Sequence, residues 1–320
     1  MPKTVTNKAA VGAIDVGGTK IAVGVVDAGG RILARAECPT EPEKGYAAAL
    51  ARIDAMFRRA IHASGQSIEG IGVGSTGPID PETGVFGEVG TLPGWRGSPL
   101  AEDLQRAFGV GVRVENDADA AALGEAAWGA GRGSRSLLYI TVSTGIGVGV
   151  LLDGRVYRGA GGAHPEIGHH VVDASGPLCY CRANGCWESL ASGPAMEQWA
   201  HANGGAERFP VGALTAKRIC ELAREGDTLA LQAVARSARY LGLGLANLVT
   251  MFCPETIVLG GGLMKSADLL LPCALRVVGE ICTQVPAEKT AIVLAGLGQD
   301  VGLLGAACVW RYRSGEWQMG

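Results

Sequence analysis

Cysteines, histidines and glutamates gather in one segment, residues 163–189, with the sequence AHPEIGHHVVDASGPLCYCRANGCWES. It contains three cysteines, three histidines and two glutamates. Thiolate and imidazole groups are the ligands that Zn²⁺ prefers, and four of them complete a closed structural site. The segment therefore predicts a metal site, with Glu166 and Glu188 placed to hold a polar molecule nearby.

The candidate metal ligands are Cys179, Cys181, Cys186 and one histidine, either His169 or His170. Only one residue separates Cys179 from Cys181, which is tighter than the spacing in common zinc fingers. The residues by themselves therefore leave a short-range disulfide open as an alternative. Such a disulfide would be strained, and a reducing compartment disfavours it.

The bulk properties of the chain exclude several classes of function. At 320 residues it is long enough for two domains with sizeable cores. A formal net charge of -3, with 18% charged residues, supplies no general attraction for nucleic acid or an anionic membrane. No apolar run approaches the ~18 residues that span a bilayer, and the start lacks the apolar core of a signal peptide. Because the nine cysteines are mostly scattered, we expect a reducing compartment, the cytoplasm. From the charge we expect no nucleic acid and no membrane as partners.

A pattern of three short strands occurs twice, at residues 11–37 and 137–158. In both copies, runs rich in apolar residues are separated by Gly-rich turns. The first copy is followed by a helical period over residues 46–65, and the second half returns to helix and strand over residues 227–262. This repetition predicts an α/β protein of two similar halves with a cleft between them.

Three Gly-rich turns are candidate sites for a nucleotide: DVGGTK, TVSTGIGVG and VLGGGLM. Glycines let backbone N–H groups approach a phosphate, a threonine adds a donor, and the aspartate of the first turn could hold Mg²⁺. The third turn suits the close approach of adenosine. A turn without a ligand remains the alternative for each one alone, and no GxxxxGK[ST] loop is present. The candidate nucleotide-binding residues are Asp15, Gly17, Gly18, Thr19, Lys20, Thr144, Gly145, Gly261 and Gly262.

The stretch VENDADAAALGE, residues 114–125, carries a candidate general base. Asp117 lies where a predicted strand gives way to an Ala-rich helix, and Asn116 beside it can both donate and accept hydrogen bonds. Asp117 is equally suited to cap the helix, and Asp119 is favoured there by the helix dipole. The local pattern leaves both roles of Asp117 open.

These motifs resemble, in order, those of the ROK family of sugar kinases and repressors, and they extend over about residues 12–264. The family is similar in fold to actin and hexokinase, a duplicated, ribonuclease H-like α/β architecture whose two domains flank a cleft and close on ATP and a sugar. The resemblance implies a small first domain of residues 1–117, joined by a C-terminal helix at about 302–320. It implies a larger second domain of residues 118–301 that includes the zinc-binding segment.

The resemblance also implies roles for the residues that can do chemistry. Asp117 would be the base that activates a sugar hydroxyl. A structural Zn²⁺ would be held by the three cysteines and by His169, because EIGHH matches the family's Glu-x-Gly-His. The implied sugar-binding residues are Asn116, Asp117, Glu166, His169 and Glu188, and the implied metal ligands are His169, Cys179, Cys181 and Cys186.

The resulting expectation is an ATP- and Mg²⁺-dependent kinase of the 6-hydroxyl of a hexose, with glucose as the first choice. N-acetylmannosamine, N-acetylglucosamine, fructose and mannose stay open, because Pro165 is typical of family fructokinases and Thr91 replaces a common asparagine of family glucokinases. Polyphosphate or ADP as the donor also stays open. Asp119 departs from a common asparagine, and Arg182 departs from a common glycine. Family members commonly form dimers or tetramers, so a homodimer or homotetramer is expected.

Two other functions can be compared with the kinase. Repressors of the same family carry a helix-turn-helix domain before the first Gly-rich turn, and only fourteen residues precede Asp15, so DNA binding is not expected. A sugar-binding scaffold without activity is the third possibility. Asp15, Asp117 and Glu188 argue against it, because a scaffold needs no base and no metal-binding carboxylate.

Overall fold

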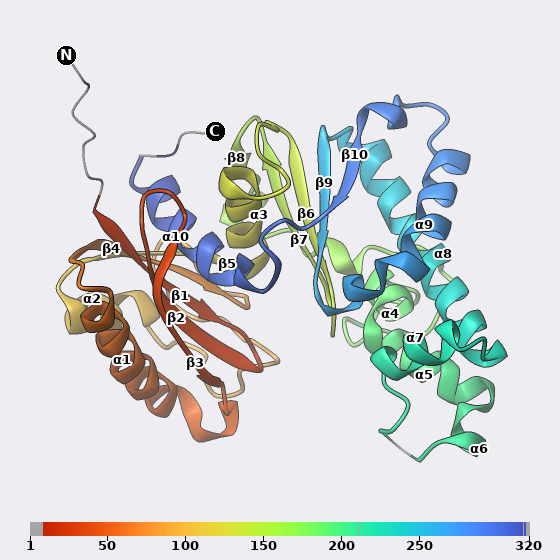
Figure 1. Cartoon of the computed structure of the whole chain (residues 1–320), viewed down its shortest axis with the longest axis horizontal. Coiled ribbons are helices and arrows are strands. Elements are labelled where there is room, and N and C mark those ends of the chain that lie inside the picture. The colour runs from red at the N-terminus through yellow and green to blue at the C-terminus, as the bar shows by residue number, and fades with distance from the viewer. Residues whose placement is uncertain (1–8, 211, 316, 318–320) are drawn as a thin grey trace. The chain divides into compact units, whose positions relative to one another are not determined.

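The computed structural model describes residues 9–210, 212–315 and 317, and its strands form two five-stranded sheets (Figure 1). The first sheet has the order β3-β2-β1-β4-β5, and the second has the order β10-β9-β6-β7-β8. The strands are β1 (Ala10–Val16), β2 (Lys20–Val26), β3 (Ile32–Pro39), β4 (Ile68–Ser75), β5 (Gly111–Asn116), β6 (Leu137–Val142), β7 (Ile146–Leu152), β8 (Arg155–Val156), β9 (Thr256–Gly260) and β10 (Ala291–Leu294).

The two sheets share one topology. In the first, β1, β2 and β3 form an antiparallel meander, and β4 and β5 add in parallel beside β1. In the second, β8 pairs antiparallel with β7, while β9 and β10 add in parallel beside β6. The duplicated α/β architecture that the repeated meander predicts is therefore confirmed.

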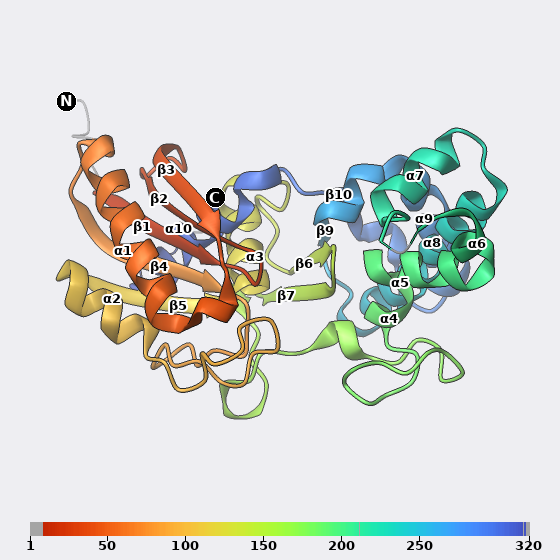
Figure 2. The same ribbon diagram turned by 90° about the horizontal axis from the view of Figure 1, so that it is seen from below.

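Helices cover both faces of the first sheet (Figure 1, Figure 2). Alternate residues of β1 explain why, since Ile14 and Val16 enter one apolar cluster while Val11 and Ala13 enter another. The first cluster lies under α1 and α2, and the second lies against the last helix of the chain. The helices of this sheet are α1 (Gly45–Ser64), α2 (Leu100–Phe108), α3 (Asp117–Trp128) and α10 (Val301–Arg313).

The last helix, α10, is buried over most of its surface, although the pattern of residues 302–313, GLLGAACVWRYR, is by itself typical of a short amphipathic helix. It packs on both β4 and α3, so it has no broad solvent face. Small residues make this possible: a methyl group on Gly72 would lie 1.8 Å from the carbonyl oxygen of Ala306, and one on Gly305 would lie 2.4 Å from that of Ala120. The backbones of β4, α3 and α10 approach closely, so α10 is buried on faces that its own sequence pattern left for solvent.

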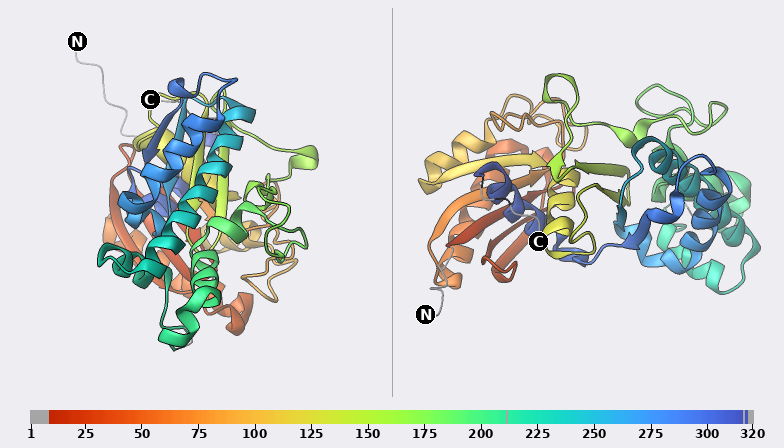
Figure 3. Two further views of the ribbon diagram at one scale, coloured as in Figure 1. Left: turned by 90° about the vertical axis from the view of Figure 1, so that its right-hand side faces the viewer. Right: turned by 90° about the horizontal axis from the view of Figure 1, so that it is seen from above.

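The remaining helices gather around one long helix, α8, which contacts α4, α5, α7 and α9 (Figure 3). Trp187 of α4 is completely buried there, and its indole nitrogen donates to the carbonyl oxygen of Tyr240 at 3.0 Å. These helices are α4 (Trp187–Ala191), α5 (Gly193–Ala200), α6 (Ala206–Arg208), α7 (Ala216–Arg224), α8 (Thr228–Phe252) and α9 (Ala267–Ile281).

The chain divides into two compact units. The first unit contains residues 1–135, 149–164 and 295–320, and the second contains residues 136–148 and 165–294. The domain limits implied by the family resemblance stay a prediction. Within the part of the chain that the structure describes, none of the helices is long and apolar enough to cross a membrane.

Candidate active site

Asp15 lies near the end of β1, and its partly buried side chain lies beside the first turn of α10. A methyl group on Gly302, at the start of α10, would lie 2.1 Å from Asp15 Oδ2, so only glycine leaves room for this carboxylate. Burial, and then the negative charge of Asp117, raise the pKa of Asp15 to about 7, against a smaller opposing effect of Lys20. The first unit therefore holds two interacting carboxylates, and a cation at Asp15 would relieve their repulsion.

The turn between β1 and β2 is held in shape by two threonines. The hydroxyl of Thr40 donates to the carbonyl oxygen of Gly17 at 2.6 Å, and the backbone amide of Thr40 donates to Thr19 at 2.9 Å. A methyl group on Gly18 would lie 2.7 Å from Cβ of Thr91. The predicted Gly-rich turn is thus fixed by packing and backbone bonds, which is what a cradle for an anion needs.

Lys20 was predicted to bind the nucleotide, and its side chain lies on the neighbouring strand. Its ammonium group pairs with Glu37 of β3 at 3.3 Å, and both side chains are about half exposed. A pair this exposed is worth little, so Lys20 could leave Glu37 for a phosphate at small cost.

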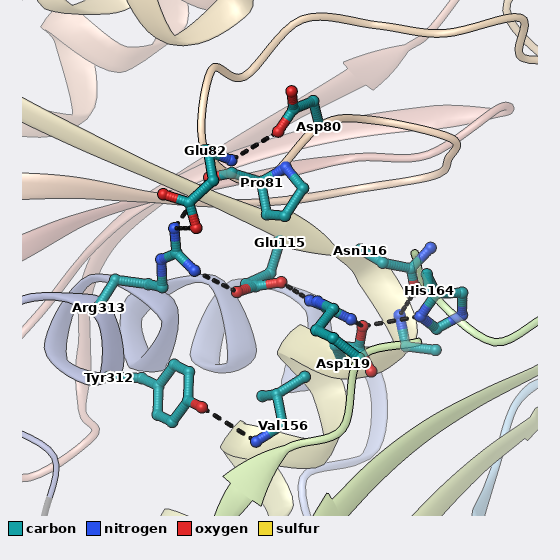
Figure 4. A network of polar contacts seen from close by, with 12 residues as sticks. Asp80, Pro81, Glu82, Glu115, Asn116, Asp119, Val156, His164, Tyr312 and Arg313 are labelled. Atoms are coloured by element: carbon teal, nitrogen blue, oxygen red, sulfur yellow. Dashed lines mark hydrogen bonds and ion pairs between the residues drawn. The ribbon is translucent and has the colours of Figure 1, made fainter. Parts of the chain in front are cut away.

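Asn116 and Asp117 lie at the junction of β5 and α3. Figure 4 shows Asn116. The side-chain oxygen of Asn116 caps the helix by accepting from the amide of Ala118 at 2.8 Å, and Asp117 Oδ1 accepts from the same amide at 2.9 Å. The helix cap is therefore Asn116, and Asp117 is the first residue of the helix. Its carboxylate lies at the positive end of α3, which favours the ionised form that a base requires.

In the second unit, two of the predicted turns adjoin. Gly261, which follows β9, has a φ of 92°, and a methyl group there would lie 2.4 Å from the carbonyl oxygen of Val142 at the end of β6. A methyl group on Gly262 would lie 3.3 Å from the hydroxyl of Ser143. Thr144 is exposed in the same β6–β7 turn. Gly261 and Gly262 are thus brought against Val142 and Ser143, the residues that lead into the turn with Thr144 and Gly145.

Glu188 is fixed against the β6–β7 turn. Its Oε2 atom accepts a hydrogen bond from the amide of Ile146 at 2.8 Å, and a methyl group on Gly145 would lie 2.4 Å from that same oxygen. A charge-assisted bond of this kind fixes one carboxylate oxygen and leaves the other for a ligand. The glycine of this turn therefore makes room for Glu188.

Glu166 and His169 are held together by one short turn of 3-10 helix, residues Ile167–His169. The amide of His169 donates to the carbonyl oxygen of Glu166 at 3.0 Å. Between them, a methyl group on Gly168 would lie 2.0 Å from the carbonyl oxygen of Ile146. Glu166, His169 and Glu188 are therefore all anchored around the first residue of β7.

The predicted metal ligands form one cluster, with ligand atoms of His169, Cys179, Cys181 and Cys186 all within 4.8 Å of one another. Nδ1 of His169 lies 3.6 Å from Sγ of Cys179, and the Sγ atoms of Cys181 and Cys186 are 3.3 Å apart. A disulfide needs about 2.05 Å, whereas ligands on the corners of a zinc tetrahedron are roughly 3.3 to 3.8 Å apart. Donor types and spacing both fit Zn²⁺.

Arg182 adopts the left-handed conformation that glycine favours. Its φ is 75°, and its amide donates to the carbonyl oxygen of Cys179 at 2.9 Å to close the turn. An arginine tolerates this conformation at some cost. The turn that presents the cysteines is therefore retained despite the departure from the family's glycine.

Tyr180 is a residue of the site that the sequence reasoning missed. Its hydroxyl lies 2.8 Å from Nε2 of His169, the nitrogen that does not face the cysteines. Most of its side chain is exposed, but loss of hydration at the hydroxyl and then the charge of Glu188 raise the pKa of Tyr180. The only signal in the sequence was its position between two cysteine ligands, and spacing does not tell where a side chain there points.

The predicted residues thus form two sets, one in each unit. The first unit brings together the carboxylates of Asp15 and Asp117, with the β1–β2 turn following Asp15. The second unit brings together the β6–β7 turn, the glycines after β9, the glutamates and the cysteine cluster. One set carries acid–base and cation-binding groups, and the other carries backbone donors and polar side chains suited to phosphates and hydroxyls.

Known proteins are similar to this chain over nearly its whole length. The model of the ROK family matches residues 11–313. A glucokinase from Halalkalibacterium halodurans is 34% identical, covering 96% of each chain. The solved ROK hexokinase from Thermus thermophilus is 39% identical with a TM-score of 0.79, covering 94% of this chain and 97% of that one. A ROK family glucokinase from Streptomyces griseus, solved with glucose and AMPPNP, is 34% identical with a TM-score of 0.79, covering 93% and 98%.

Proposed function

The chain belongs to the ROK family, and from this premise we propose that it is an ATP-dependent kinase of the 6-hydroxyl of a hexose, with glucose as the preferred sugar. The observation that carries the proposal is Asp117. It begins α3 at the end of β5, and its charge acts on the buried carboxylate of Asp15. A base beside a cation-binding carboxylate is the pair that phosphoryl transfer to a hydroxyl requires.

Asp117 takes the proton in the proposed reaction. As its carboxylate accepts the proton of the sugar hydroxyl, the hydroxyl oxygen bonds to the γ-phosphorus of ATP, and the bond from that phosphorus to the β–γ bridging oxygen breaks. ADP leaves with the electrons of that bond, and the protonated Asp117 returns its proton to solvent. Asn116 holds the sugar beside this base through its side-chain amide.

Asp15 binds the Mg²⁺ that accompanies the nucleotide. Its pKa, raised to about 7 by burial and by Asp117, reflects a carboxylate that lacks a full counter-charge. A divalent cation would supply that charge and lower the pKa of Asp15 again. In the first unit the amides of Gly18 and Thr19 would then be available to phosphates, whereas the amide of Gly17 is used by the carbonyl oxygen of Lys20. In the second unit the glycines after β9 would be available to adenosine.

The cysteine cluster binds one structural Zn²⁺ in this proposal. The ion closes the loop that runs from His169 to Cys186 and performs no step of the reaction. Its effect is to fix Glu166 and Glu188, which lie three residues before His169 and two residues after Cys186, toward the sugar hydroxyls. A homodimer or homotetramer in the cytoplasm stays a prediction.

A panel of sugars tests the proposal. Release of ADP from MgATP is coupled to a readable reaction and measured with glucose, mannose, fructose, N-acetylglucosamine and N-acetylmannosamine. We expect glucose to lead by about 100-fold in kcat/KM, the scale on which pocket contacts discriminate. If another sugar has the highest kcat/KM, the proposed substrate is wrong. If the folded protein is inactive with every sugar, the proposed kinase activity is contradicted.

A further inference from the structure

The helix that begins at Asp117 also anchors the chain where it passes between the two units. The chain crosses between residues 135 and 136, 148 and 149, 164 and 165, and 294 and 295. Residues Ala118 to Ala126 of α3 are buried, although this stretch contains two carboxylates, Asp119 and Glu125, each completely inaccessible to solvent. Buried charges on a helix need partners. The partners of Asp119 and Glu125 lie close to the points at which the chain passes from one unit to the other.

Glu125 holds the crossing before α10. Its carboxylate accepts from the amides of Ala130 at 2.7 Å, Gly296 at 3.0 Å and Leu297 at 3.0 Å. The last two residues follow the crossing at 294 and 295 directly. At another crossing, a methyl group on Gly149 would lie 2.1 Å from the carbonyl oxygen of Ala118, so β7 also touches α3 where it enters the first unit.

Asp119 holds the crossing that leads to the sugar-binding segment. Its Oδ2 atom lies 2.8 Å from Nδ1 of His164, the last residue of the first unit on this segment (Figure 4). Because an ionised carboxylate only accepts hydrogen bonds, Nδ1 of His164 carries the proton in this contact. Only Pro165 separates His164 from Glu166. The contact therefore lies two residues from a side chain proposed to hold the sugar.

The charge of Asp119 is held by an arginine from the same segment. Arg158 pairs with Asp119 and also with Glu115 of β5, and all three side chains are mostly or completely buried. Glu115 is in turn 3.6 Å from Arg313 of α10 (Figure 4). Breaking a buried charge pair on one side is costly, so this network fixes both ends of residues 158–164 on the first unit.

We propose that Asp119 is a positioning residue of the sugar site: held by Arg158, it fixes His164 and with it the point from which the chain carries Glu166 to the sugar. The inference rests on the proposed kinase function for its effect on the sugar, but the contact itself concerns only the first unit. Asp119 touches neither substrate in this account. It acts on the KM for the sugar and leaves the proton transfer by Asp117 unchanged.

Substitutions at His164 test the proposal without disturbing the buried charges. In His164→Ala the contact is lost, and we expect the sugar KM to rise about 10-fold while kcat and the KM for ATP stay within about 3-fold. In His164→Asn the side-chain amide can donate from nearly the position of Nδ1, so most of the sugar affinity should return. Asp119→Asn keeps an acceptor for His164 but loses its charge for Arg158, and we expect an intermediate KM.

Glu125→Gln is the matched control. Glu125 lies in the same helix and is equally buried, but it holds residues 296 and 297, which contain no proposed sugar ligand. We expect Glu125→Gln to lower the melting temperature and to leave the sugar KM near that of the wild type. A rise in sugar KM as large in this control as in His164→Ala would reduce Asp119 to a general stabilising residue.

Hydrogen–deuterium exchange gives a readout that does not depend on activity. In His164→Ala, the amides of residues 159–168 should exchange at least about 10-fold faster, while those of α3 remain protected. Wild-type protein without kinase activity would contradict the proposed function and leave this readout intact. Unchanged exchange, or an unchanged sugar KM in an active enzyme, would overturn the positioning role.

Discussion

The two sheets have the same topology but carry different chemistry at the ends of their strands. The central strand of the first sheet, β1, has Asp15 as its penultimate residue, whereas its counterpart β6 has Thr141 at that position and is followed by Ser143 and Thr144. The parallel strand at the sheet edge, β5, is followed by Asp117, whereas its counterpart β10 is followed by Ala295. Carboxylates thus occupy the first half where uncharged residues occupy the second.

This difference favours a division of labour between two halves of one architecture, with catalysis in the first half and sugar binding in the second. In the first half, the carboxylates of Asp15 and Asp117 repel each other. A cation bound there would offset this repulsion. In the second half, the corresponding turn receives Glu188 from α4, and the carboxylate of Glu188 is fixed by the backbone amide of Ile146. The two halves therefore share one topology and differ in the residues at their strand ends.

The largest effect should follow from the loss of the base in the first half. Asp117→Asn keeps the shape of the side chain but cannot accept the sugar proton, so kcat should fall by about 10² to 10⁴-fold. Single-turnover kinetics with glucose and MgATP would measure it. Glu102→Gln, an exposed change in α2, serves as the control. If Asp117→Asn turns over at the wild-type rate, the base lies elsewhere.

The second effect is a pH dependence of stability that comes from Asp15, the partly buried carboxylate of the first half. Because the pKa of Asp15 is about 7 in the folded chain and near 3.8 when unfolded, the native state retains a proton that the unfolded chain releases. Its contribution to stability is therefore lost as the pH rises from about 4 through 7, by about 3 kcal/mol. Urea unfolding without Mg²⁺ or nucleotide should show this slope in the wild type.

Asp15→Asn is the comparison that isolates this carboxylate, since the asparagine side chain has no proton to lose. As the pH rises across the same range, the unfolding free energy of the wild type should fall relative to that of Asp15→Asn. Parallel stability curves for the two proteins from pH 4.5 to 7.5 would show that Asp15 does not titrate as proposed.

The third effect concerns the cysteine cluster of the second half. Cys186→Ser should abolish the binding of one zinc per chain and raise the sugar KM on the order of 100-fold, because the loop between Glu166 and Glu188 is no longer closed. Elemental analysis gives the zinc content, and kinetics give the KM. Cys273→Ser, outside the cluster, is the control. Fully active protein without zinc would remove the ion from the account.

The smallest effect compares the two Gly-rich turns directly. In Gly145→Ala the new methyl group would lie 2.4 Å from Glu188 Oε2, whereas in Gly17→Ala it would lie 3.1 Å from the carbonyl oxygen of Lys20. Displacing Glu188 weakens a charge-assisted hydrogen bond, so Gly145→Ala should raise the sugar KM about 10-fold. Gly17→Ala should change the KM for ATP about 3-fold at most. Equal effects of both on the sugar would show that the turns do not differ in role.

Much of the fold follows from local pattern, because the apolar strands, their Gly-rich turns and the helix over residues 46–65 each carry a period of their own. The repeat of the meander then indicated the duplication. The buried character of α10 could not be predicted in this way. It depends on Gly72 and Gly305, which are far apart in the sequence and matter only when their backbones meet.

The candidate site divides in the same manner. The cysteine cluster was predictable because its ligands lie within one segment, and their side chains do meet. The roles of Tyr180, and of Asp119 with His164, were not predictable, because each depends on where a loop places a polar group relative to a distant helix or histidine. The sequence indicated only that the helix dipole favours Asp119, and the family resemblance, which offers an asparagine there, gave it no catalytic role.

The most direct test of the division of labour measures two quantities on Asp117→Asn and Glu188→Gln side by side. One quantity is the dissociation constant for glucose by calorimetry, and the other is kcat with saturating glucose and MgATP. We expect Asp117→Asn to keep the dissociation constant within about 3-fold while kcat collapses, and Glu188→Gln to weaken glucose binding about 10-fold with a smaller loss of kcat. If both variants lose the same quantity to the same degree, the two halves do not divide catalysis and sugar binding between them.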